Sequence, residues 1–177
     1  SRSADPHSYF FTQKLDRKTT LVFGDLKDGK RMMDIVSRYE IDYIFHLGAQ
    51  PIVTTAYINP GETIESNIMG TVNILEAARL CKTVKGIVIA SSDKAYGTSE
   101  GIYKESDPLR GNHPYEVSKS AADLIAQTYA VTYKLPVIIT RFGNIYGPGD
   151  LNFSRIIPGI LRSVLTKNDL IIRSDGT

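Results

Sequence analysis

The sequence has a single cysteine, no tryptophan, only three histidines and no apolar run long enough to cross a membrane. Because Cys81 has no partner for a disulfide within the chain, we expect a reducing compartment, the cytoplasm. The histidines lie far apart, and no cluster of histidine, cysteine and carboxylate residues has the spacing of a metal site, so no metal is expected. A net charge of +2 gives no reason to expect a nucleic-acid or membrane partner.

What remains is the composition of an ordinary globular domain. The chain has 177 residues, of which 42% are hydrophobic and 23% charged. This length suits one domain or part of one, with enough apolar surface for a buried core. The sequence contains no internal repeat, low-complexity segment or linker.

Short apolar runs alternate with segments of helical periodicity. The runs predict strands at 20–23, 43–47, 86–90, 136–140 and 170–172. The periodic segments predict helices at about 29–39, 60–80, 115–133 and 156–165. Residues 1–18 are expected to be mostly irregular. The alternation predicts an α/β fold of the Rossmann-like type, a doubly wound parallel sheet with helices on both faces.

Tyr115 and Lys119 stand four residues apart in a predicted helix, so their side chains share one face. A tyrosine is a poor base near neutrality because its ordinary pKa is about 10. A lysine cation one turn away favours the phenolate and lowers that pKa. The pair can therefore act as a base, although the same spacing also occurs by chance in surface residues.

Ser91, Ser92, Asp93 and Lys94 follow the predicted strand 86–90. In open parallel sheets, ligands bind beyond the carboxyl ends of the strands. A hydroxyl, a carboxylate and an amine in a row can serve as donor, acid and base. The alternative is a polar turn with solvated charges.

Three other strand ends carry small or polar residues. Gly48 and Ala49 would let a flat cofactor approach the backbone, or would form a tight turn. Asp25 could bind an adenine or ribose edge, or could cap a helix. Asn144, after Gly143, offers both a donor and an acceptor to a sugar.

These elements occur in the order GD, HLGAQ, NIMGT, SSDKAYG, YxxxK and RFGNIYGPG. In this order the chain, from about residue 19 to 177, resembles the extended short-chain dehydrogenase/reductases that act on nucleotide sugars. The Asp93–Lys94 pair looks like that of the CDP-glucose 4,6-dehydratases, as do HLGAQPIV and YKESDPLRGNHPYEVSK. One departure is Thr54–Thr55, where that group usually has two arginines.

The resemblance implies a reaction with bound NAD. The sugar is oxidised at C4, water is eliminated across C5 and C6, and hydride returns to C6. Tyr115, helped by Lys119 and Ser92, would take the proton of the 4-hydroxyl group. Lys94, in the position of the family's glutamate, would remove the C5 proton. Asp93 would protonate the departing 6-hydroxyl group.

The resemblance also assigns binding residues. The implied NAD contacts are Asp25, Leu26, Leu47, Gly48, Ala49, Asn67, Ser91, Tyr115, Lys119 and Gly143. The implied contacts with the nucleotide sugar are Gln50 and Asn144. The long helices 60–80 and 115–133 commonly form a homodimer interface in this family, although they could simply cover the sheet.

The family's first strand and its glycine-rich phosphate loop have no counterpart among these residues. We therefore expect residues 1–177 to be a partial NAD-binding domain, with 150–177 entering the substrate-binding region. The absent strand would lie between strands 20–23 and 43–47 in the usual order. The chain alone is expected to bind NAD weakly or not at all. A 4-epimerase or reductase on the same scaffold, and a non-catalytic remnant, remain alternatives.

Overall fold

The computed structural model describes residues 6–98, 101–170 and 172. These residues form two compact units. The larger is Val22–Gly143, and the smaller combines the described residues of the segments 1–21 and 144–177. Each unit is described by itself.

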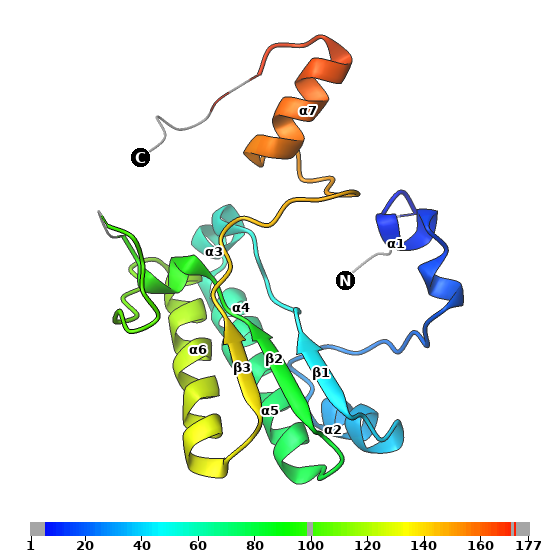
Figure 1. Ribbon diagram of the computed structural model, residues 1–177, viewed down its shortest axis with the longest axis vertical. Helices are drawn as coiled ribbons and strands as arrows, with labels where there is room; N and C mark the ends of the chain where they lie inside the picture. Colours follow the sequence, from blue (N-terminus) through cyan, green and yellow to red (C-terminus); the bar gives the residue numbers. More distant parts are fainter. Residues whose placement is uncertain (1–5, 99–100, 171, 173–177) are drawn as a thin grey trace. The chain divides into compact units, whose positions relative to one another are not determined.

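A three-stranded parallel sheet forms the centre of the larger unit (Figure 1). Its strands are β1 (Tyr43–His46), β2 (Gly86–Ala90) and β3 (Val137–Thr140), in the order β1-β2-β3. All three were predicted from their apolar runs. Tyr43 is aligned with Gly86, and Ile87 with Val137. The parallel register brings the carboxyl ends of the strands to one edge of the sheet, as the sequence had indicated.

Helices connect the strands. The unit contains α2 (Gly29–Arg38), α3 (Val53–Ile58), α4 (Pro60–Ile64), α5 (Gly70–Leu80) and α6 (Pro114–Tyr133). The Asp28 carboxylate caps α2 by accepting from the Arg31 amide. The Asn59 side chain caps α4, and Pro60 suits its first turn. The predicted helix 60–80 exists, but a π-helical turn, Glu65–Met69, separates α4 from α5.

One face of the sheet carries the core. Ile87 and Ile89 of β2 pack with Leu75 and Ala78 of α5 and with Ala126 of α6. Figure 1 shows α5 and α6 along that face. A second cluster, containing Met32, Val36, Ile74 and Ala77, joins α2 to α5. Burial of the larger of these side chains, at about 1.5–3 kcal/mol each, holds the helices against the sheet, among them α6, which bears Tyr115 and Lys119.

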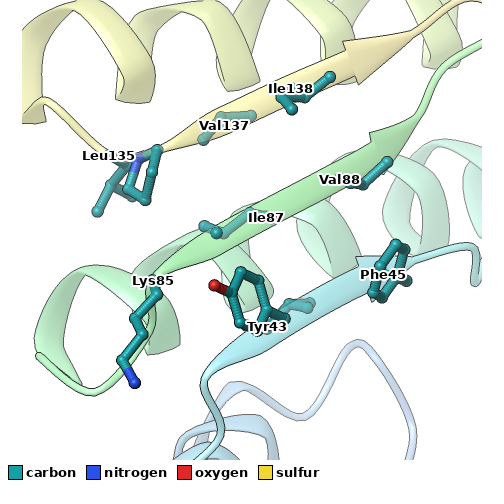
Figure 2. Close-up of a pocket in the computed structure, with 11 residues that line it drawn as sticks. Tyr43, Phe45, Lys85, Ile87, Val88, Leu135, Val137 and Ile138 are labelled. Carbon is teal, nitrogen blue, oxygen red and sulfur yellow. The ribbon is translucent and has the colours of Figure 1, made fainter.

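The opposite face of the sheet is open. The side chains of Tyr43, Phe45 and Ile138 are 63%, 69% and 63% exposed. They line a shallow apolar pocket of about 400 Å³ across the three strands (Figure 2). A doubly wound sheet has helices on both faces. Within this unit, the described helices pack on only one.

The predicted strand 20–23 was wrong, because these residues are irregular. Leu21 and Phe23 are 50% and 78% exposed. An isolated strand leaves its backbone groups unpaired, and these residues have no strand beside them in the described structure. The predicted strand 170–172 lies partly outside the described residues, and Leu170 is irregular.

The smaller unit is helical. It contains α1 (Tyr9–Thr12), a 3₁₀ turn (Leu15–Arg17) and α7 (Ile156–Thr166). Gly149 has φ +81°, and a Cβ there would clash with Tyr9, so glycine is required. The Arg162 guanidinium lies 4.7 Å from the centre of the Phe153 ring.

Candidate active site

Lys119, on α6, lies at the carboxyl end of β2. It stands one turn after Tyr115 on α6 and is 9% exposed. Its Nζ donates a 2.9 Å hydrogen bond to the carbonyl oxygen of Ala90. Burial lowers the pKa of Lys119. The helix therefore presents this amine to the strand end and not to bulk solvent.

The Ser92–Lys94 motif forms the start of a 3₁₀ turn, Asp93–Tyr96. The Ser92 hydroxyl accepts from the Lys94 amide at 3.2 Å and donates to Asp93 Oδ1 at 3.1 Å. Lys94 Nζ lies 3.5 Å from Asp93 Oδ2. The main-chain amide of Asp93 donates to the carbonyl of Phe142, just beyond β3. These hydrogen bonds stabilise the turn and hold the Asp93 carboxylate beside the Lys94 amine.

The turn and α6 are joined directly. Ser120, which follows Lys119, donates from its hydroxyl to the Ala95 carbonyl at 2.7 Å. The Arg110 amide donates to the same carbonyl, and the Gly111 amide donates to Ser120 Oγ. The structure therefore brings together the two motifs that the sequence placed about twenty residues apart.

Asn67, in the π-helical turn, fastens the loop after β1 to α6. Its Oδ1 accepts from the Gln50 amide at 2.7 Å, and its Nδ2 donates to the Gln50 carbonyl and to Ser118 Oγ. The side chain is 2% exposed, and these bonds occupy its amide. The direct NAD contact that the resemblance assigns to Asn67 stays a prediction. In the structure, Asn67 holds Gln50, a predicted substrate contact.

His46, the last residue of β1, received no role from the sequence. Its Nε2 lies 3.1 Å from Thr71 Oγ1, and Thr71 donates to the Asn67 carbonyl. Burial, and then the charge of Lys119, lower the pKa of His46 to about 4. The ring is therefore neutral at pH 7, and the positive charge at this strand end belongs to the lysine.

Leu26 packs against the loop after β1. A Cβ at Gly48 would lie 2.6 Å from Leu26 Cδ1, the end of a flexible side chain, so a larger residue there would make Leu26 shift. Asn73 of α5 donates to the Leu26 carbonyl at 2.8 Å. Asp25 accepts from the Lys27 amide in a local turn, and Asp28, not Asp25, caps the following helix. The predicted cofactor residues Leu26 and Gly48 are therefore neighbours.

Gly143 and Asn144 fall on the two sides of the boundary between the units. A Cβ at Gly143 would lie 3.9 Å from Asp93 Oδ2, which puts this glycine beside the candidate acid. Asn144 belongs to the smaller unit, so its predicted substrate contact stays a prediction.

Sequence reasoning missed an aromatic stack beside the candidate base. The rings of Tyr57 and His113 stack at 5.3 Å, and those of His113 and Tyr115 at 6.4 Å. His113 Nε2 lies 3.3 Å from Glu116 Oε1, and its Nδ1 is buried with no hydrogen-bond partner among the described residues. The sequence feature that could have revealed this stack is the HPYE segment. It puts the His113 imidazole just before the first turn of the helix and the Glu116 carboxylate within that turn.

The described residues contain no group of three or more histidine, cysteine or carboxylate side chains arranged to hold a metal ion. They also contain no helix whose length and apolar character would let it cross a membrane.

The model of the GDP-mannose 4,6 dehydratase family matches residues 6–176. The chain belongs to this family. It is 34% identical over 162 residues to a CDP-glucose 4,6-dehydratase of Salmonella typhimurium, covering 85% of this chain and 45% of that protein. It is 33% identical to a dTDP-glucose 4,6-dehydratase of Streptomyces antibioticus, covering 91% and 47%. The chain thus spans about half the length of these curated relatives.

Solved structures show the same relationship. A dTDP-glucose 4,6-dehydratase from Streptomyces venezuelae, a double mutant with NAD bound, superimposes with a TM-score of 0.81 and 31% identity, covering 94% of this chain and 51% of that one. A UDP-glucose 4-epimerase from Thermotoga maritima gives the same TM-score at 26% identity, covering 93% and 54%. The α/β fold predicted from the sequence is confirmed, and the solved structures that share it include a dehydratase and an epimerase.

Proposed function

We propose that the protein containing this chain is an NAD-dependent nucleotide-sugar 4,6-dehydratase. The observation that carries the proposal is the junction of the Asp93–Tyr96 turn with α6. An acid and an amine in the turn lie next to the helix that bears Tyr115 and Lys119. A 4-epimerase needs only the tyrosine and lysine, whereas elimination of water also needs an acid and a second base.

The proton transfers can be assigned to this chain's residues. Tyr115 accepts the proton of the sugar 4-hydroxyl group, and the Lys119 charge favours the phenolate. Lys94 takes the C5 proton, and Asp93 gives a proton to the departing 6-hydroxyl group. The 3.5 Å separation of Lys94 Nζ and Asp93 Oδ2 supports this division, since it puts an acid and a base on one turn.

The residues present fit a nicotinamide cofactor. Lys119 uses one of its three N–H donors on Ala90, which leaves two for ribose hydroxyl groups. Gly48 and Ala49 leave the loop after β1 without bulky side chains at two successive positions. The residues that would hold NAD are Asp25, Leu26, Leu47, Gly48, Ala49, Asn67, Ser91, Tyr115, Lys119 and Gly143. Bound there, NAD would accept hydride from C4 and return it to C6.

CDP-glucose is the proposed substrate. The 34% identity to a CDP-glucose 4,6-dehydratase and the Asp93–Lys94 pair support it. Gln50, whose Oε1 accepts from the Ile52 amide and whose Nε2 donates to Thr63, lies in the loop proposed to contact the sugar. The 4-epimerase is the second candidate, and the similarity to a solved epimerase supports that alternative.

The test is incubation of the full-length protein with NAD and with CDP-, dTDP-, UDP- or GDP-hexoses. Dehydration yields a 4-keto-6-deoxy sugar, whereas epimerisation yields an isomer of unchanged mass. We expect the dehydration product from CDP-glucose. Tyr115→Phe should abolish it, and Tyr39→Phe, at the exposed end of α2, should not. Formation of an isomer alone would replace the dehydratase by an epimerase, and no product from any sugar would favour a non-catalytic remnant.

We also propose a homodimer through α6. Val117, Leu124 and Val131 recur at seven-residue spacing on this helix and are 41%, 51% and 68% exposed. Such a stripe suits helix-to-helix packing. Leu124→Lys is expected to shift the protein from dimer to monomer in sedimentation experiments, whereas Ser37→Lys, at an exposed position on α2, should not. A monomeric wild type would exclude the dimer.

A further inference from the structure

Asp123 is a carboxylate buried beneath the candidate site. It stands on α6 one turn after Lys119 and is fully buried. Its oxygens accept hydrogen bonds from Ser91 Oγ at 2.6 Å and from Gln127 Nε2 at 2.7 Å. Arg141 binds it with two parallel bonds, from Nε at 2.8 Å and Nη2 at 3.0 Å. Burial alone would raise the pKa of Asp123, but the bonds from Arg141, Ser91 and Gln127 outweigh this and hold it below its ordinary value.

Arg141 extends the connection to the far end of the turn. Its Nη1 donates to the Tyr96 hydroxyl at 2.8 Å and to the Glu105 carbonyl at 3.0 Å. The guanidinium also lies 5.0 Å from the centre of the Tyr96 ring. Tyr96 stacks on Tyr103, whose hydroxyl donates to the Gly97 carbonyl.

The Asp123–Arg141 ion pair thus binds residues on both sides of Asp93 and Lys94. Ser91 precedes Asp93 by two residues and binds Asp123, whereas Tyr96 follows it by three and binds Arg141. Arg141 also precedes Phe142, whose carbonyl accepts from the Asp93 amide. We propose that Asp123 and Arg141 are positioning residues that fix Asp93 and Lys94 relative to Tyr115, in a role that rests on the proposed dehydratase function.

The pair also governs what Asp93 can bind. Asp93 and Arg141 line one pocket of about 430 Å³, together with Tyr96 and Tyr103. A carboxylate in this pocket is attracted to an unpaired guanidinium. Because both parallel bonds of Arg141 go to Asp123, the arginine charge is already compensated. Asp123 therefore keeps the Arg141 charge from pairing with Asp93.

Stability alone does not require such a pair. Replacing a buried ion pair by apolar residues of similar size is often neutral or stabilising, whereas removal of one partner is costly. The paired replacement therefore separates the two roles. Asp123→Leu with Arg141→Met removes both charges together and preserves packing volume, but it releases Ser91 and Tyr96 from their partners.

The experiment measures kcat, KM and urea unfolding in the full-length protein. For Asp123→Leu/Arg141→Met we expect a folded protein whose kcat falls by about 10²-fold, the cost of a displacement near 1 Å, with KM changed less than about twofold. Gln127→Met is the matched control, because it also removes a bond to Asp123 but releases neither end of the turn. Its kcat should stay at the wild-type value. An unchanged kcat in the folded double variant, or a change confined to KM, would overturn the proposal.

Two further measurements keep the inference testable. If the double variant does not fold, Tyr96→Phe removes only the hydroxyl bound by Arg141, and its kcat should fall a few-fold with KM unchanged. If the wild type dehydrates no nucleotide sugar, the proposed function fails, and amide exchange decides the positioning role. The amides of Asp93 and Ala95 should then exchange faster in the double variant, while those of α5 keep their protection. Unchanged exchange at the turn would refute it.

Discussion

The Nζ of Lys119 lies 2.9 Å from the carbonyl oxygen of Ala90, the last residue of β2. This bond holds a largely buried amine at the sheet edge where the candidate residues gather. Because burial lowers the pKa of Lys119, the unfolded chain binds a proton more tightly than the folded chain does. Stability contributed by this group should therefore rise with pH between the lowered folded pKa and the ordinary value of 10.5.

Lys119→Met tests this relation. The free energy of unfolding of the wild type, relative to that of the variant, should increase as the pH rises from 7 toward 10.5. Urea unfolding across this range measures it, and groups common to both proteins cancel in the difference. Parallel stability curves would contradict a charged amine held out of water.

His46 should make the larger unit acid-sensitive. Its pKa is about 4 when folded and 6.5 when unfolded, so the unfolded chain alone takes up the proton between these values. Stability should be lost as the pH falls from 6.5 to 4, by about 3 kcal/mol in all. His46→Gln, which can still bond to Thr71, should remove this loss. An equal loss in the variant would show that other groups cause the acid sensitivity.

Asp93→Asn should stop elimination without preventing substrate binding. The amide cannot donate a proton to the departing hydroxyl group, so kcat should fall by about 10²–10⁴-fold while KM changes little. Asp42→Asn is the control, since Asp42 pairs with Lys85 before β1, away from the strand ends that form the site. Steady-state kinetics of 4-keto-6-deoxy sugar formation provide the measurement. Wild-type kcat in Asp93→Asn would remove Asp93 from the mechanism.

Replacement by alanine should change the stability of the protein in opposite directions at Gly97 and at Gly61. Gly97 has φ +74°, and a Cβ there would strike the carbonyl of Arg110, so Gly97→Ala should destabilise by at least about 2 kcal/mol. Gly61 lies in α4 with no atom near the added Cβ. Gly61→Ala should stabilise by about 0.5 kcal/mol, because alanine loses less backbone entropy in a helix. Thermal unfolding measures both, and a destabilised Gly61→Ala would contradict the open space.

The open sheet face should promote self-association. Phe45 and Ile138 are exposed over an apolar pocket, and large apolar patches tend to associate in water (Figure 2). Phe45→Thr retains strand propensity and should reduce association of the isolated chain at high concentration. Light scattering over a concentration series measures this association. The thermal midpoint should not fall, and equal scattering in both proteins would exclude this face.

Local patterns predicted much of this fold. The apolar run at Gly86–Ala90 predicted β2 with its observed bounds. Such continuous runs are typical of parallel strands that are covered on both faces. The run at 20–23 looked equally apolar, yet it is irregular. Strand formation there depends on a neighbouring strand, which a local pattern does not contain.

The sequence motifs predicted which residues gather at the candidate site, but not all of the contacts that hold them there. The order of the strand ends indicated that Asp93 and Lys119 belong to one site, and the contacts of Ala95 with Ser120 join them. Asp123 was missed, although it continues the spacing of Tyr115 and Lys119. Its partner Arg141 lies eighteen residues away on another element, and only the folded chain shows that the two meet.

The π-helical turn at Glu65–Met69 separates α4 from α5, so that each helix can turn a different face toward its neighbours. Before the turn, Thr63 bonds to Gln50, and beyond it Leu75 belongs to the core. Deleting one residue from the turn would rotate one helix by about 100° against the other. The chain could then satisfy either the polar contacts of α4 or the apolar contacts of α5. The π-helical turn therefore allows the polar contacts of α4 and the apolar contacts of α5 to form at the same time.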